Sequence, residues 1–234
     1  MALTDHLRPP TSLRGDPIVR DAIALGLAVG TFAVSYGALA RAAGLTAAQA
    51  IAISLLVFTG ASQFAFIGVL AAGGGLAAAV LPAAVLAVRN GLYGIAVAPL
   101  LRGPLGQRLA LSHLVIDEST AMARAQSEPQ RGRRAFIATG LAILVCWNLG
   151  TAAGVVLGGA LGDPRRLGLD AMLPAAFLAL LVPQLSQPGA RRIAVVGGLV
   201  ALALVPFVPA GLPIVAAGAT VLLILVPRRR GAVA

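Results

Sequence analysis

Charged residues are scarce in this chain of 234 residues: they make up 11% of it, against 59% apolar residues. So small a polar share cannot coat a soluble globule, which excludes an ordinary water-soluble domain. Lysine is absent, so all 18 basic residues are arginine, and the net charge is +10. Because the arginines stand mainly at the ends of apolar segments, this charge indicates membrane topology and no binding to nucleic acid.

Residues that enzymes and metal sites commonly use are also sparse. The chain has one cysteine, Cys146, and two histidines, His6 and His113, which both fall on polar segments. A single cysteine cannot form a disulfide within the chain, and the short motifs of zinc proteases, serine hydrolases and nucleotide-binding loops are missing. We therefore expect no enzyme, no catalytic residue, no metal and no cofactor.

The sequence consists instead of long apolar runs. A helix needs about 20 residues to cross roughly 30 Å of hydrocarbon, and the alternating pattern of barrel strands is missing. We predict an all-α fold, a polytopic membrane helical bundle of six to seven transmembrane segments with at least one interrupted or re-entrant helix. The seven apolar segments, broken only by Arg89, are 22–40, 45–81, 82–101, 135–161, 173–185, 193–208 and 212–226.

The arginines divide the chain and orient it in the lipid bilayer. Residues 1–20 form a polar N-terminal arm, 21–227 the membrane transport domain and 228–234 a basic tail. Within the domain, the arginine-rich connection 102–134, with an amphipathic helix over 105–126, is expected in the cytoplasm. Even numbers of segments separate it from the arginines at 191–192 and 228–230. The C-terminus of a multi-pass protein of the bacterial inner membrane is therefore predicted to be cytoplasmic.

The side of the N-terminus depends on the second apolar segment. Seven full spans place it outside, whereas a re-entrant second segment places it inside together with Arg8, Arg14 and Arg20. Acidic neighbours such as Asp5 and Asp16 reduce the net charge of this arm, so that it can be translocated. We slightly favour seven spans.

One charged residue, Arg89, lies deep within an apolar segment. A charge near the bilayer centre costs about 2.5–3.5 kcal/mol, so Arg89 is expected to face the bundle interior or a wet cavity. Asn90 follows it, and Tyr93 stands one turn further on the same helix face. The guanidinium can bind a substrate carboxylate or a protein acid there, or it can form a structural ion pair between helices.

A second polar feature is the run from Gly60 to Phe64. Small residues beside Ser62 and Gln63 allow the helix to unwind, and the free N–H groups of the next half-helix would suit a carboxylate. Alternatively, the small residues only permit close helix contact. We interpret the other spaced glycines as helix-packing faces, and we expect the triple glycine 73–75 to end a helix; the packing glycines are Gly26, Gly30, Gly150, Gly154 and Gly158.

Three acidic residues are candidates for ion or proton coupling. Asp117 and Glu118 lie on the connection 102–134, where they can pair with Arg89 or relay a proton. Asp170 precedes the fifth segment, where it either stabilises a helix start through the helix dipole or belongs to an ion pathway.

These motifs carry a family resemblance. Gly60-Ala61-Ser62-Gln63-Phe64 is similar to the most recognisable motif of the AzlC family, the large subunit of two-component branched-chain amino acid exporters. The run 89–94 resembles that family's Arg-His-x-x-Tyr element, with Asn90 in place of the histidine and Ala87 where Asn or Asp often stands. Further matches between residues 22 and 226 are Asp117-Glu118, Trp147-x-x-Gly150-Thr151-x-x-Gly154 and Gly168-Leu169-Asp170.

The resemblance implies a secondary transporter that exports leucine, isoleucine, valine and methionine with a small AzlD-like membrane subunit. It implies alternating access around a midplane site, in which Arg89 or the backbone at 60–63 holds the substrate carboxylate and Phe64 shapes an apolar pocket. Coupling to the proton gradient is compatible with this activity. The alternatives are a non-transporting scaffold or regulatory subunit, and an exporter of another small amphiphilic solute.

Overall fold

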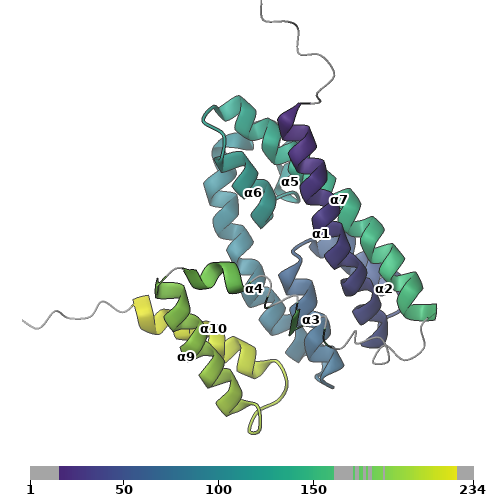
Figure 1. Ribbon diagram of the computed structural model, residues 1–234, viewed down its shortest axis with the longest axis vertical. Coiled ribbons are helices and arrows are strands. Elements are labelled where there is room, and N and C mark those ends of the chain that lie inside the picture. The colour runs from purple at the N-terminus through teal and green to yellow at the C-terminus, as the bar shows by residue number, and fades with distance from the viewer. Residues whose placement is uncertain are drawn as a thin grey trace, which may run out of the picture.

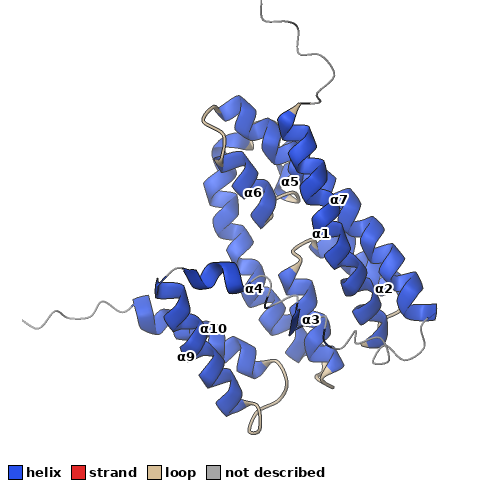
Figure 2. Cartoon of the chain, viewed as in Figure 1, coloured by secondary structure: helices blue, strands red, loops and turns tan. Residues whose placement is uncertain are grey.

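The computed structural model describes residues 16–160, 171, 174–175, 178, 181–186 and 188–225. Every regular element in this described part of the chain is a helix, which confirms the predicted all-α class (Figure 2). The candidate Asp170, most of the N-terminal arm and the basic tail lie outside the described residues.

Two long helices, α1 (Pro17–Ala42) and α7 (Pro129–Ala160), run side by side in the same direction (Figure 1). Their contact is lined by small residues: Gly26 faces Ala142, and Gly154 faces the backbone of Val34. This close approach confirms the predicted packing role of the spaced glycines. Both helices also begin at the same end, because the Asp16 carboxylate beside α1 forms a 2.6 Å ion pair with Arg134.

The segment after α1 forms a hairpin of two half-length helices, α2 (Ala47–Val57) and α3 (Ala61–Ala71). They run in opposite directions, since the Gln63 side chain of α3 donates to the Ile53 carbonyl of α2 at 3.0 Å. We call α2 and α3 the first hairpin. It enters and leaves the bundle at the end where α1 finishes, which confirms the predicted re-entrant or interrupted helix.

Helix α4 (Leu76–Val97), extended by the short turn η1 (Ala98–Leu100), returns toward the start of α1. Its end lies beside the start of α7, because Arg133 donates to the Leu100 carbonyl at 3.0 Å. α3 ends and α4 begins on either side of the glycines 73–75, as predicted. We call the end of the bundle that contains the starts of α1 and α7 the arginine-rich end; its described arginines are Arg20, Arg102, Arg124, Arg131, Arg133 and Arg134.

The next segment forms a second hairpin from α5 (Leu105–Ser112) and α6 (Asp117–Arg124). It enters from the arginine-rich end and packs along α7, where Gly140 faces Leu114 and Gly132 faces Ala123. The predicted single amphipathic surface helix over 105–126 is therefore wrong. The cause is an apolar run at the connection, whose residues are buried in the bundle instead of lying on the membrane surface: Leu111, Leu114, Val115 and Ile116.

The two hairpins give the bundle an inverted internal repeat. α1 is followed by the first hairpin, and α4, which runs the opposite way, is followed by the second hairpin from the opposite end (Figure 1). Opposed repeats with half-helices that meet in the middle are typical of secondary transporters.

The second apolar segment, which we favoured as a full span, forms the first hairpin instead. In the described part of the chain, three helices are long and apolar enough to cross a membrane: α1, α4 with η1, and α7. The first hairpin begins and ends at the end of the bundle where α1 finishes, and α4 starts from that same end. Segment 45–81 therefore does not cross the bundle as one full span before α4. The remaining described helices, α9 (Pro188–Leu204) and α10 (Leu212–Leu225), pair with each other beside α4, after the short turn η3 (Val182–Ser186).

Candidate functional site

A cavity of about 110 Å³ lies where the tips of the two hairpins meet. The first tip is Phe58 to Gly60 and the second tip is His113 to Ile116; the rings of Phe58 and His113 are 5.6 Å apart between centroids. Helices α1, α4 and α7 complete the wall. The lining residues are Val29, Phe32, Phe58, Thr59, Gly60, Ala61, Phe64, Arg89, Ile116, Asp117, Glu118, Ile143 and Trp147.

The first tip is held in an uncommon backbone conformation by one side chain. Phe58 has a φ of 38° and Gly60 a φ of 56°, so both lie in the left-handed region, which is strained for phenylalanine and is often found at functional sites. The Gln63 amide accepts from the Gly60 N–H at 3.1 Å while its nitrogen donates to Ile53. Gln63 was predicted as a substrate ligand. Its side chain is 1% exposed, and it stabilises the conformation of the first tip through these two hydrogen bonds.

The second tip is built in a similar way. The Ser119 hydroxyl accepts from the Ile116 N–H at 3.2 Å and donates to the Leu114 carbonyl at 2.6 Å. Asn90 of α4 donates to the Val115 carbonyl at 3.1 Å. In both tips, the side chain of the third residue of the helix accepts a hydrogen bond from the backbone N–H of the residue that directly precedes the helix. α3 and α6 therefore begin at the cavity, with the positive ends of their dipoles there.

An ion pair crosses the cavity wall from α4 to α6. The Arg89 Nη1 atom is 2.8 Å from the Asp117 Oδ2 atom, and the two side chains are 33% and 40% exposed. Asp117 is thus the acid of the protein itself that the sequence analysis gave as one alternative partner for Arg89. Within the described part of the chain, the buried Arg89 Nε–H has no hydrogen-bond partner. Arg89 thus keeps a donor for a further acceptor.

Glu118, the next residue on α6, also lines the cavity. It forms no ion pair within the described ranges, in contrast to Asp117. α6 lies outside the helices of spanning length. Burial raises the pKa of the Glu118 carboxyl, and the Asp117 charge raises it further, whereas its own backbone N–H and Arg89 lower it. The net shift is upward, so Glu118 is protonated more readily than an exposed glutamate.

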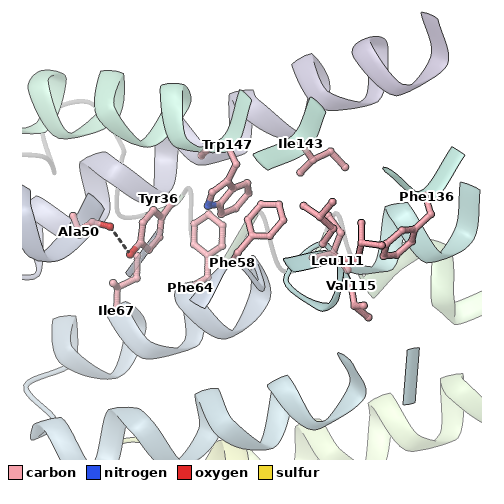
Figure 3. Close-up of a cluster of buried hydrophobic side chains, with 14 of the residues drawn as sticks. Tyr36, Ala50, Phe58, Phe64, Ile67, Leu111, Val115, Phe136, Ile143 and Trp147 are labelled. Carbon is pink, nitrogen blue, oxygen red and sulfur yellow. Dashed lines mark hydrogen bonds between the residues drawn. The ribbon is translucent and has the colours of Figure 1, made fainter. Parts of the chain in front are cut away.

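Aromatic side chains form the apolar wall at the first tip (Figure 3). Phe64 makes edge contacts with Tyr36 and with Trp147, at centroid distances of 5.9 and 6.3 Å. Two buried polar atoms nearby, Thr59 Oγ1 and Trp147 Nε1, have no hydrogen-bond partner among the described residues. Unpaired polar atoms in an apolar cavity favour a ligand with both polar and apolar parts.

A second cavity of about 250 Å³ lies between the first hairpin and α4. Its wall is almost entirely apolar and includes Phe66 of α3 and Ala87 of α4. Ser62, predicted as a substrate ligand, lines this cavity, and its buried hydroxyl has no partner in the described structure. Ala87, where the resemblance expects Asn or Asp, adds to the apolar surface.

The structure brings together only part of the predicted site. Gly60, Phe64 and Arg89 line the central cavity with Asp117 and Glu118. The others lie nearby. Ser62 and Gln63 line the second cavity, and Asn90 donates a hydrogen bond to the second tip. Tyr93, one turn from Arg89 on α4, packs against the hydrophobic core. The lining residues that were not predicted as site residues are Val29, Phe32, Phe58, Thr59, Ala61, Ile116, Ile143 and Trp147.

Comparison with known proteins assigns the chain to a family of membrane proteins. The model of the family described as AzlC protein matches residues 24–161, more than half of the chain. An uncharacterized membrane protein of Archaeoglobus fulgidus is 33% identical over 177 residues, which cover 73% of this chain and 75% of the relative. Inner membrane protein YgaZ of Escherichia coli is 30% identical over 199 residues, which cover 79% and 80% respectively. No solved structure matches the chain significantly. The opposed hairpins and the apolar helices thus belong to a membrane protein of the AzlC family.

Proposed function

We propose that the protein is a secondary transporter that exports branched-chain amino acids from the cytoplasm together with a small AzlD-like membrane subunit. The observation that carries this proposal is the Arg89–Asp117 ion pair in a central cavity between two opposed hairpins. An ion pair that only tied helices together would not need an open cavity, a free Arg89 donor and two converging helix starts beside it.

The cavity matches the chemistry of a small zwitterion with a branched apolar side chain. The Arg89 Nε–H offers a donor for the carboxylate, and the acids of α6 offer acceptors for the ammonium group. Phe58, Phe64 and Ile143 offer an apolar wall for the side chain. The volume of about 110 Å³ is below the roughly 300 Å³ at which pockets for drug-sized ligands begin, which favours a small solute.

The distribution of arginines supports an orientation with the arginine-rich end in the cytoplasm. Arg41, at the end of α1, is the described arginine nearest the opposite end. In a Cys146→Ala background, a membrane-impermeant maleimide is expected to label Ala42→Cys in intact cells and Arg20→Cys only after permeabilisation. Both positions are exposed. The reverse labelling pattern would contradict this orientation.

Counterflow of radiolabelled leucine tests the proposed function. Proteoliposomes that contain this chain with the small partner subunit are loaded with unlabelled leucine, and uptake of external labelled leucine is followed. We expect transient accumulation above the level of protein-free vesicles, which isoleucine and valine suppress. A scaffold or regulatory subunit instead gives a flux that is unchanged when this chain is omitted, and that result would reject the proposal.

A further inference from the structure

A third cavity of about 330 Å³ lies beside the central cavity, and Phe58 and Thr59 of the first tip line both. The end of α5 contributes Ser112 to its wall, and the second tip contributes His113. Both of these polar residues are exposed. Within the described part of the chain, the third cavity is therefore open at the surface of the bundle, at the level of the two tips.

The two tips lie near the middle of the membrane. α2 has 11 residues and α5 has 8, which correspond to about 16 and 12 Å of helix. The two helices reach the tips from opposite ends of the bundle, and their lengths together are close to the roughly 30 Å of hydrocarbon. A group that is exposed at the tips would therefore meet lipid tails unless another molecule covers it.

The groups exposed there are unsuited to lipid. Backbone that is not helical is tolerated at membrane depth only where protein or water covers it, and an imidazole at this depth almost always faces a protein interior or a wet cavity. The Ser112 hydroxyl donates to the Leu109 carbonyl at 2.7 Å, so it can still accept a hydrogen bond. The surface of His113 and Ser112 thus fits a partner that has a hydrogen-bonding group of its own.

The third wall of this cavity, α4, has the shape of a helix-packing face. Among the helices of spanning length, α4 is the least covered: 11% of its most apolar stretch is buried, against 39% in α1 and in α7. Gly91 and Gly94 line the third cavity, and a Cβ atom at either position would meet nothing within 4 Å. Glycines on the face of a spanning helix allow a second helix to approach closely.

We propose that a spanning helix of the small partner subunit docks in the third cavity, against Gly91 and Gly94 of α4, and covers the polar tips of the two hairpins. This inference rests on the proposed function for the identity of the partner. The docked helix has small residues on the side that meets α4 and, near the middle of its length, a side chain that hydrogen-bonds to His113 or Ser112.

This position gives the partner subunit a role at the central cavity. Because Phe58 and Thr59 line both cavities, the docked helix contacts the same tip that forms the wall of the central cavity. It supports that tip from outside, as Gln63 does from within the first hairpin, and it keeps lipid away from the contact between the rings of Phe58 and His113.

Photo-cross-linking in membranes tests the docking site. The photoreactive residue p-benzoylphenylalanine replaces Ser112 in one sample and Leu149 in the other, and the chain is produced together with a tagged small subunit. Leu149 is the matched control, because it is 66% exposed and lies on α7, away from the third cavity. Irradiation is expected to cross-link the Ser112 position to the small subunit and to leave the Leu149 position without that cross-link.

A substitution on α4 gives a second, independent readout. Gly91→Leu is expected to reduce the amount of small subunit that copurifies about tenfold or more, because the added side chain overpacks the docking face. The melting temperature of this chain alone is expected to stay unchanged, since a Cβ atom at Gly91 meets no described residue. Gly159→Leu, at an exposed glycine of α7 with the same open surroundings, is expected to keep full copurification.

The outcomes separate this inference from the proposed function. The docking site would be overturned by a cross-link from Ser112 to a second copy of this chain, by none to the small subunit, by an equal cross-link from Leu149, or by full copurification with Gly91→Leu. Leucine counterflow in the presence of any of these results would leave the proposed function intact. The expected cross-link without counterflow by the complex would support the docking site and reject the proposed function.

Discussion

Replacement of Arg89 by glutamine is expected to abolish leucine counterflow while the protein still inserts and folds. The guanidinium lines the cavity, carries a buried Nε–H with no hydrogen-bond partner among the described residues, and neutralises Asp117 at 2.8 Å. Its loss removes a charge-assisted hydrogen bond to the solute, worth roughly 1.5–3 kcal/mol or about 10- to 150-fold in affinity. It also leaves Asp117 and Glu118 as neighbouring acids without a cation, which disfavours binding of a carboxylate further.

Two further substitutions control this result. Arg134→Gln removes another ion pair of the same kind, with Asp16, but Arg134 is 62% exposed and lies outside the cavity. An exposed pair is worth about 0.2–1 kcal/mol, so counterflow is expected to stay within a few-fold of the unmodified rate. Arg89→Lys keeps the charge but loses the planar fork, and intermediate activity is expected. Normal counterflow by Arg89→Gln would show that Arg89 is only a structural cation.

The largest expected effect on folding is at Gly154. A Cβ atom at this position would overlap the Val34 carbonyl of α1 and come within 3.0 Å of the Ala38 backbone nitrogen one turn further on. Backbone cannot move aside as a flexible side chain can, so Gly154→Leu must separate α1 from α7. Overpacking typically costs about 1–3 kcal/mol for added methylene groups, and a contact with backbone along two parallel helices is less tolerant. We expect little folded protein.

The matched control is Gly159→Leu, five residues further along α7, where a Cβ atom meets nothing within 4 Å. The yield of monodisperse protein after detergent extraction and its melting temperature in detergent measure both variants. Gly159→Leu is expected to behave as the unmodified protein. If Gly154→Leu gave the same yield and melting temperature, α1 and α7 could not be in contact through this glycine face.

The sequence predicted the features that depend on local chemistry. Three glycines end a helix, as predicted. At 60–62 and at Arg89 the sequence left two alternatives each, and the structure has a helix break at the first position and an ion pair with Asp117 at the second. The second hairpin was not predicted. α5 and α6 each have only eight residues, too few for a helical period to be recognised, and with Asp117 and Glu118 they resembled an amphipathic surface helix. The buried position of Leu114 and Val115 arises from contacts with α7, which spacing does not reveal.

Long-range contacts also decided the role of individual site residues. Asn90 donates to a carbonyl 25 residues away, so it positions the second tip, and no local pattern indicates that pairing. Tyr36 and Phe58 stand in apolar runs where an aromatic residue can equally face lipid or the core. Only the packing of α1 against the first hairpin places Tyr36 against Phe64 (Figure 3), and only the meeting of the two tips places Phe58 at the cavity.

A water-filled cavity that receives the solute is the central claim, and protection of a cysteine in its wall tests it most directly. In a Cys146→Ala background, Thr59→Cys lines the cavity, whereas Val88→Cys lies on the outer face of α4 and is 66% exposed. A small water-soluble methanethiosulfonate, which modifies thiols in contact with water, is expected to react with Thr59→Cys and not with Val88→Cys. Leucine at ten times its Kd is expected to slow the Thr59→Cys reaction about tenfold, in proportion to the unoccupied fraction. No reaction at Thr59→Cys, or a rate that leucine leaves unchanged, would contradict the claim.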